Sequence, residues 1–218
     1  MRAQYPGKCG VCSQSISPGD EIVSGGQSSR WIHQGCGTAP DSAASSAPAA
    51  APKPGSRAPA SATVVFTDGS CLVNPGGPGG WAWAVDTEEH DSGPDPSTTN
   101  QRMEIRAAFE AVKAHSGPLH VVSDSQYVVN CFAQAWWRGW YSRGWLNSAK
   151  KPVANRDLWE PFIELVLERG DVTFEWVKGH AGHDMNEFVD QLAGAAAAQA
   201  AQAAMLQMRR IVVADLEA

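Results

Sequence analysis

The sequence predicts an α/β fold in which a mixed sheet of about five strands is flanked by helices. Short apolar runs of strand character alternate with longer segments whose apolar residues recur at helical spacing. Elements that alternate in this way build an α/β sheet. The strands are expected at residues 63–68, 80–86, 90–94, 119–123 and 172–177, of which 90–94 is the weakest because its surroundings are polar. The helices are expected at residues 101–115, 125–134, 136–142, 155–168 and 184–205.

Composition divides the 218 residues into four segments. Residues 1–37 are glycine-rich and carry potential metal ligands. In residues 38–62, Ala, Pro and Ser occupy twenty of twenty-five positions, which predicts a disordered linker that buries no core. Residues 63–198 are long enough to bury a core of their own and are the expected catalytic domain. Residues 199–218 are expected to form a C-terminal helical tail.

Membrane and secretory functions find no support in the sequence. No run of 18 apolar residues is present, and no apolar segment follows Arg2 at the N-terminus. Three of the five cysteines lie in a metal-like pattern rather than a disulfide pattern. We therefore expect a cytoplasmic location and no membrane partner.

The distribution of charge is more informative than the net charge of −6. The segment from Ser125 to Arg156 contains no acidic residue. Its basic residues are interleaved with tryptophans, and the set comprises Arg138, Arg143, Lys150, Lys151, Arg156, Trp136, Trp137, Trp140 and Trp145. A cationic surface beside an acidic centre can hold nucleic-acid phosphates. The alternative is that the tryptophans are packing residues of the core.

Four carboxylates stand where strands end or helices run, namely Asp68, Glu104, Asp124 and Asp190. Carboxylates at strand ends can converge at one edge of an α/β sheet. Four such groups repel one another unless divalent cations lie between them, and oxygen ligands suit Mg²⁺ or Mn²⁺. Paired ions roughly 3.5–4 Å apart are typical of phosphodiester chemistry. The alternative is that these acids cap helices or lie on the surface, as Asp124 could at a helix start.

Six stretches, in order, resemble type 1 ribonuclease H (ribonuclease HI) over about 130 residues. They are Thr67-Asp68-Gly69-Ser70-Cys71, Asn74-Pro75-Gly76, Thr98-Thr99-Asn100-Gln101-Arg102-Met103-Glu104, Ser123-Asp124-Ser125-Gln126-Tyr127-Val128, Asn155-Arg156-Asp157-Leu158-Trp159, and the run from Trp176 through Gly179-His180-Ala181-Gly182-His183 to Asp190-Gln191-Leu192-Ala193. The resemblance implies a ribonuclease H-like fold, a monomer, and cleavage of the RNA strand of an RNA–DNA hybrid with two Mg²⁺ ions, for which Mn²⁺ can substitute. The implied products are a 5′-phosphate and a 3′-hydroxyl.

The same resemblance implies a role for each carboxylate. Asp68 is expected to bridge both ions, Glu104 and Asp124 to hold the ion near the attacking water, and Asp190 to hold the ion near the leaving 3′ oxygen. His180 is expected to assist proton transfer or product release, since its loop of glycines can move.

Substrate contacts are expected from amides and from the basic, tryptophan-rich segment. Asn74, Asn100 and Gln126 match family positions that touch the nucleic acid, and Thr99 can add a phosphate contact. The alternative is that they are turn residues. We call the basic, tryptophan-rich part of the segment from Ser125 to Arg156 the handle. The contacts expected from it are Trp140, Arg143, Trp145, Lys150 and Lys151. Tyr141 and Ser142 stand where handles of this family commonly carry basic residues.

Residues 1–37 predict a separate structural zinc site. Cys9, Cys12, His33 and Cys36 form two pairs, each with two intervening residues, and such soft ligands suit Zn²⁺. The alternative is a redox Cys-x-x-Cys pair with an unrelated histidine. The expected partner of this module is either additional nucleic acid or a protein.

Two other functions remain compatible with the motifs. One is a DNA-cutting nuclease of the same fold, and the other is a non-catalytic nucleic-acid adaptor. The Gly-His-Ala-Gly-His loop and the handle disfavour the first, and the complete set of four acids disfavours the second.

Overall fold

The computed structural model describes residues 1–12, 14–24, 31–36 and 58–216. The predicted linker at 38–62 lies outside the described residues up to residue 57, so its disorder stays a prediction. No described helix has both the length and the apolar character that crossing a membrane requires.

The main body is a five-stranded mixed sheet in the order β7-β6-β5-β8-β9. Its strands are β5 (Thr63–Cys71), β6 (Gly79–Ala84), β7 (His90–Asp95), β8 (Leu119–Ser123) and β9 (Val172–Trp176). The hairpin strands β5, β6 and β7 are antiparallel, whereas β8 and β9 join parallel to β5. All five predicted strands are confirmed, including the weak one.

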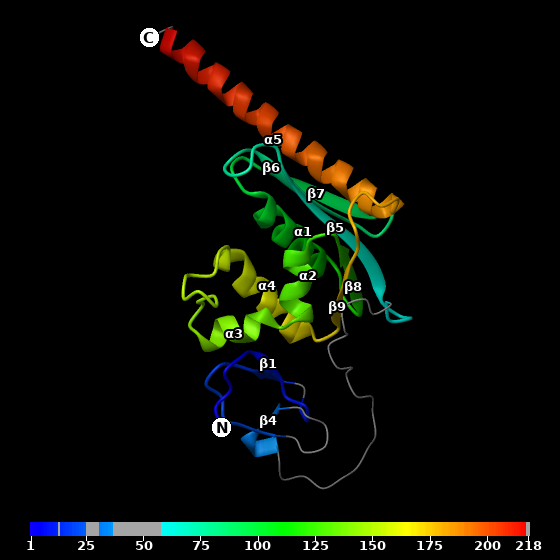
Figure 1. Ribbon diagram of the computed structural model, residues 1–218, viewed down its shortest axis with the longest axis vertical. Helices are drawn as coiled ribbons and strands as arrows, with labels where there is room; N and C mark the ends of the chain where they lie inside the picture. The colour runs from blue at the N-terminus through cyan, green and yellow to red at the C-terminus, as the bar shows by residue number, and fades with distance from the viewer. Residues whose placement is uncertain (13, 25–30, 37–57, 217–218) are drawn as a thin grey trace.

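Helices cover both faces of this sheet (Figure 1). They are α1 (Asn100–Ala114), α2 (Gln126–Ala133), α3 (Trp136–Ser142), α4 (Arg156–Arg169) and α5 (Asp184–Leu216). Strand β6 shows how the two faces differ. Trp81 and Trp83 belong to the large core shared with α1, α2 and α4. Ala82 and Ala84 face the other way and pack with Val189 and Ala193 of α5, where small side chains allow a close approach.

Helix α5 continues to Leu216, past the bound of residue 205 predicted for the last helix and into the segment expected to form a helical tail. The Ala-rich part of α5 favours this, because alanine has the highest helix propensity. Ala200 is its last buried residue among those whose side chains are described, and Met205 and Met208 are exposed. Figure 1 shows this end of α5 extending away from the sheet.

The N-terminal module consists of two small hairpins. They are formed by β1 (Gly7–Lys8) with β2 (Ser15–Ile16) and by β3 (Ile22–Ser24) with β4 (Trp31–His33), and the 3₁₀ turn η2 (Gln34–Cys36) follows. Among the described residues of this module, the buried apolar core consists of Ala3, Cys9, Ile16, Ile22 and Ile32.

Candidate active site and metal-ligand clusters

Three of the predicted carboxylates meet at one edge of the sheet. Asp68 lies on β5, Glu104 on α1, and Asp124 directly after β8, and each offers an oxygen within 4.8 Å of the others. Gly69 makes this meeting possible. A Cβ atom at this position would collide with the backbone of Met103 and Glu104, so only glycine lets α1 lie so close to β5.

Burial and mutual repulsion raise the pKa of two of these carboxyls in the absence of cations. Burial, followed by the charges of Asp124 and Asp190, raises the pKa of Asp68 to about 7. Burial and the charge of Asp68 raise the pKa of Glu104 well above its usual value. Ionised groups in such a place need a compensating charge.

Asp190 approaches the cluster from α5. Its charge and its side-chain hydrogen bond both raise the pKa of Asp68, so the fourth predicted carboxylate lies next to the first. One turn earlier on the same helix, the Asn186 side-chain amide donates to Oδ2 of Asp124 over 3.5 Å. Sequence reasoning missed Asn186. Its position four residues before Asp190, on the same face of a helix, was the available signal.

Buried oxygen atoms in the cluster are consistent with cation binding. Oε2 of Glu104 and Oδ1 of Asn186 are buried and have no hydrogen-bond partner among the described residues. Buried acceptors are normally satisfied. Carboxylate and amide oxygens are also the ligands that Mg²⁺ and Mn²⁺ accept, so this donor set fits hard divalent cations.

Two of the amide side chains predicted to contact substrate, Asn74 and Asn100, belong to a series of hydrogen bonds that ends at Glu104. Oδ1 of Asn74 accepts from the backbone N–H of Asn100 over 3.3 Å, and the Asn100 side chain donates to Oε1 of Glu104 over 3.3 Å. Thr99 is the N-cap of α1, where its hydroxyl oxygen accepts from the N–H of Arg102. Gln126 is exposed at the start of α2.

The predicted histidine loop lies over Asp124. Trp176 donates its indole N–H to the backbone oxygen of Asp124 at 2.9 Å. A Cβ on Gly179 would collide with the Asp124 carboxylate, so the loop backbone packs directly on that group. His180 is exposed and has a positive φ of 51°. The His183 carbonyl accepts the N–H of Glu187 in the first turn of α5, so His183 immediately precedes this helix.

The predicted handle is formed by α3 and the loop before α4. A cavity of about 560 Å³ lies there, and Trp136, Trp140 and Arg143 are among its lining residues. Lys150 and Lys151 are exposed. Trp140 and Trp145 are only 7% and 6% exposed, and Arg156 lies 5.0 Å from the Trp145 ring centroid. Their burial argues against direct stacking of a base on either ring, and it favours the alternative that these two indoles support the handle from within the core.

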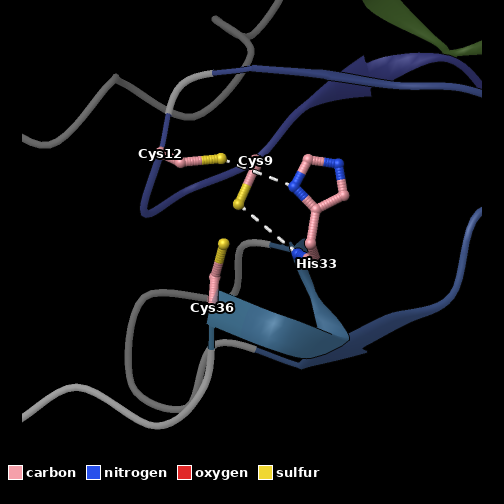
Figure 2. A group of neighbouring side chains, drawn as sticks. All are labelled: Cys9, Cys12, His33 and Cys36. Atoms are coloured by element: carbon pink, nitrogen blue, oxygen red, sulfur yellow. Dashed lines mark hydrogen bonds between the residues drawn. The ribbon is translucent and has the colours of Figure 1, made fainter.

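The four soft ligands of the N-terminal module also converge (Figure 2). Cys9, Cys12, His33 and Cys36 each offer a ligand atom within 4.8 Å of the others. Nδ1 of His33 lies 3.4 Å from the Cys12 sulfur, while Nε2 lies 3.3 Å from the carbonyl oxygen of Ser15. One imidazole nitrogen therefore faces the cluster, and the other is held by a backbone acceptor, as is usual for a metal-ligating histidine.

Thiolate character in this cluster is uneven in the absence of metal. Burial opposes ionisation of Cys9, but backbone N–H groups of Cys12, His33 and Val11 outweigh it and lower the pKa of the Cys9 thiol to about 6. The neighbouring Cys12 side chain and burial raise the pKa of Cys36 to about 11. Metal binding requires deprotonated thiols, so the Cys36 sulfur, whose pKa its neighbours raise, gains most from a shared cation.

Comparison with known sequences agrees with this geometry. A sequence profile described as RNase H matches residues 60–198. Ribonuclease H of Erythrobacter litoralis is 50% identical over 138 residues, which are 61% of this chain and 94% of the relative. Ribonuclease H of Thermus thermophilus is 46% identical over 140 residues, which are 62% of this chain and 83% of the relative.

Solved structures extend the comparison to the fold. LC9-RNase H1, a type 1 RNase H with the type 2 active-site motif, is 31% identical with a TM-score of 0.52, covering 66% of this chain and 75% of that chain. The foamy viral protease-reverse transcriptase in complex with dsDNA is 27% identical with a TM-score of 0.55, and the match covers 62% of this chain and 94% of that chain.

The sheet order and the carboxylate cluster define an RNase H-like α/β protein. The chain belongs to the RNase H family. The predicted family and enzyme class are therefore confirmed. Residues 1–59, which include the Cys/His cluster, precede the part of the chain that the family profile matches.

Proposed function

We propose that this protein hydrolyses the RNA strand of RNA–DNA hybrids, leaving a 5′-phosphate and a 3′-hydroxyl, with two Mg²⁺ ions held by Asp68, Glu104, Asp124 and Asp190. The observation that supports this proposal most is the convergence of three carboxylate oxygens within 4.8 Å, with Asp190 beside them. Bound Mg²⁺ ions would supply charge stabilisation and a more acidic water for attack on phosphorus.

The residues of the chain place the reacting groups. Asp68, between the other carboxylates, would bridge the two ions, and Glu104 and Asp124 would orient the attacking side. Asp190 would serve the leaving 3′ oxygen. His180, exposed on a loop above Asp124, would exchange a proton with water or with the departing product.

Recognition of the hybrid would come from two surfaces. Asn74, Asn100 and Gln126 can donate to and accept from sugar hydroxyls and base edges, and the 2′-hydroxyl distinguishes RNA from DNA. The handle would hold phosphates of the duplex through Arg143, Lys150 and Lys151, which are exposed.

A single cleavage gel tests this proposal against its rivals. A labelled RNA–DNA hybrid is incubated with Mg²⁺, with EDTA, and with Mg²⁺ and the Asp124→Asn variant, beside a DNA duplex of the same sequence. We expect cleavage of the hybrid in the first lane only. Cleavage of the DNA duplex would favour the DNA-cutting nuclease, and tight binding of the hybrid without cleavage would favour the adaptor.

We also propose that residues 1–37 bind one structural Zn²⁺ ion through Cys9, Cys12, His33 and Cys36. A core of five buried small or medium side chains cannot stabilise two hairpins alone, so the ion would supply the missing free energy. Metal analysis of the full-length protein should give one zinc per chain, and Cys9→Ser with Cys12→Ser should abolish uptake. If Cys9 and Cys12 were instead a redox pair, the chain would contain no metal and these two cysteines would form a disulfide.

A further inference from the structure

An aromatic side chain of the N-terminal module, Tyr5, packs against the catalytic domain. The Tyr5 ring centroid lies 5.5 Å from that of Trp137, with the planes at 90°, and 5.8 Å from that of Tyr141, with the planes at 78°. These are edge-to-face arrangements, which are favourable for aromatic pairs. Strand β1 also lies against α4, and Figure 1 shows the module beside α3 and α4.

Helix α3 presents a different stripe of side chains to each side. Trp137 and Tyr141, one turn apart, receive Tyr5. Trp136, Trp140 and Arg143 lie on the other stripe and line the handle cavity. A helix of seven residues is not stable by itself, so what packs on one stripe determines how firmly the other is held.

Tyr141 is well suited to this contact and poorly suited to phosphate binding. Its hydroxyl is buried with no hydrogen-bond partner among the described residues, and its ring also lies 5.2 Å from that of Trp145. The Tyr141 ring therefore packs between the module, through Tyr5, and the handle, through Trp145.

The position of Tyr5 depends on the Cys/His cluster. Tyr5 precedes Cys9 by four residues, and β1 lies between them. The Cys9 N–H donates to the Gln14 carbonyl at 2.9 Å, and the buried Cys9 side chain belongs to the core of the module. Loss of the ion would unfold this small module and remove the constraint that holds Tyr5 against α3.

We propose that the metal-loaded N-terminal module braces the handle, so that metal occupancy at Cys9, Cys12, His33 and Cys36 controls the strength of hybrid binding through the Tyr5 contact. The inference rests on the proposed zinc site and on the proposed action on hybrids. The module thus acts through α3 and needs no nucleic-acid contact of its own.

Hydrogen–deuterium exchange of the full-length chain tests the brace without reference to activity. The Tyr5→Ala variant in its zinc-loaded form, and the wild type treated with a soft-metal chelator in excess Mg²⁺, should both exchange amides 136–142 about five- to tenfold faster, whereas β8 stays unchanged. Tyr5→Phe is the matched control and should behave as the wild type, because only the ring makes the described contacts. If amides 136–142 of zinc-loaded Tyr5→Ala exchange at the same rate as in the wild type, the proposal is overturned.

Kinetics on the hybrid provide the second measurement. Tyr5→Ala should raise KM for the hybrid about five- to tenfold with kcat unchanged, and zinc content should stay at one per chain. A fall in kcat with unchanged KM contradicts a brace of the binding surface. If the wild type takes up no zinc, the proposed dependence on metal is wrong, but the exchange experiment on Tyr5→Ala still tests whether Tyr5 braces α3.

If the wild type does not cleave the hybrid, the proposed nuclease function is wrong. The exchange experiment does not depend on cleavage and still tests the brace.

Discussion

Asn186, in the first turn of α5, donates its side-chain amide to Oδ2 of Asp124 at the end of β8 over 3.5 Å. The side chain of Asn186 is 1% exposed, so the hydrogen bond forms in a place that water does not reach freely. It joins the helix that carries Asp190 to the strand end that carries Asp124. The relative placement of two proposed metal ligands therefore depends on one amide.

Asn186→Ala should lower kcat about ten- to a hundredfold at limiting Mg²⁺, because groups that orient metal ligands typically matter to this degree. Since Asn186 is a positioning residue, raising Mg²⁺ should recover part of the rate, and KM for the hybrid should stay the same. The measurement is kcat against Mg²⁺ concentration, with the exposed neighbour Gln191→Ala as control. A Mg²⁺-independent loss would assign Asn186 a different role.

The raised pKa of Asp68 makes a prediction about stability in the absence of metal. The folded protein holds this proton up to about pH 7, whereas the unfolded chain releases it near 3.8. Between these values the folded state binds more protons, so the free energy of unfolding of the metal-free protein should fall as pH rises from about 4 to about 7. Above about pH 7, ionisation of Asp68 causes no further fall in the free energy of unfolding.

Asp68→Asn mimics the protonated form and should remove the part of this pH dependence that Asp68 contributes, leaving the part that the raised pKa of buried Glu104 contributes. Near pH 8, the metal-free variant should be more stable than the wild type by on the order of 3 kcal/mol, whereas near pH 4 the two should agree. Urea unfolding in EDTA at several pH values measures the difference, and exposed Glu88→Gln is the control. Adding Mg²⁺ should stabilise the wild type and leave Asp68→Asn almost unaffected. Parallel pH profiles for wild type and variant would contradict the assigned cause.

Gly69→Ala should destabilise the protein and reduce cleavage together. The new methyl group would meet the backbone of Met103 and Glu104, which cannot move without shifting α1 and its carboxylate. We expect a loss of about 1–3 kcal/mol of unfolding free energy, as for other overpacked positions. Gly194→Ala in α5 is a matched control with open space at its Cβ, and it should stabilise the protein by roughly 0.5–1 kcal/mol. If Gly69→Ala and Gly194→Ala changed the free energy of unfolding equally, the close approach of α1 to β5 at Gly69 would be refuted.

Local patterns were sufficient to predict the elements of the catalytic domain. The apolar strands and most of the periodic helices stand within a few residues of their predicted bounds, and Asp124 directly follows the end of β8 as expected. Asp68, predicted at a strand end, lies instead inside β5, which continues to Cys71 because residues 69–71 still pair with β6. The bound of residue 205 predicted for the last helix falls short of Leu216, whereas the helical tail expected at residues 199–218 covers the extension. Helix propensity continues through Ala-rich sequence without tertiary contacts.

Features that depend on contacts between distant segments were not predictable. Tyr5 gave no local signal, because its partners Trp137 and Tyr141 lie more than 130 residues away in the chain. The interleaving of tryptophans with basic residues left open whether the rings contact substrate or pack in the core, and the structure buries Trp140 and Trp145. Composition identifies a segment that carries rings and cations, but only packing decides which of them reach the surface.

Substituting Arg143, Lys150 and Lys151 together by Ala should raise KM for the hybrid and flatten its dependence on salt. Each cation that contacts a phosphate contributes about 0.9 to the slope of log binding constant against log salt, so loss of three should reduce the slope by about 2–3. Arg143 also donates from Nε to the carbonyl of Leu146 at 3.1 Å, which helps to shape the handle. The double variant Lys150→Ala with Lys151→Ala is therefore the cleaner comparison and should reduce the slope by about 2. Binding of the hybrid measured at several salt concentrations decides the matter: an unchanged slope in the double variant means that these lysines do not contact phosphate.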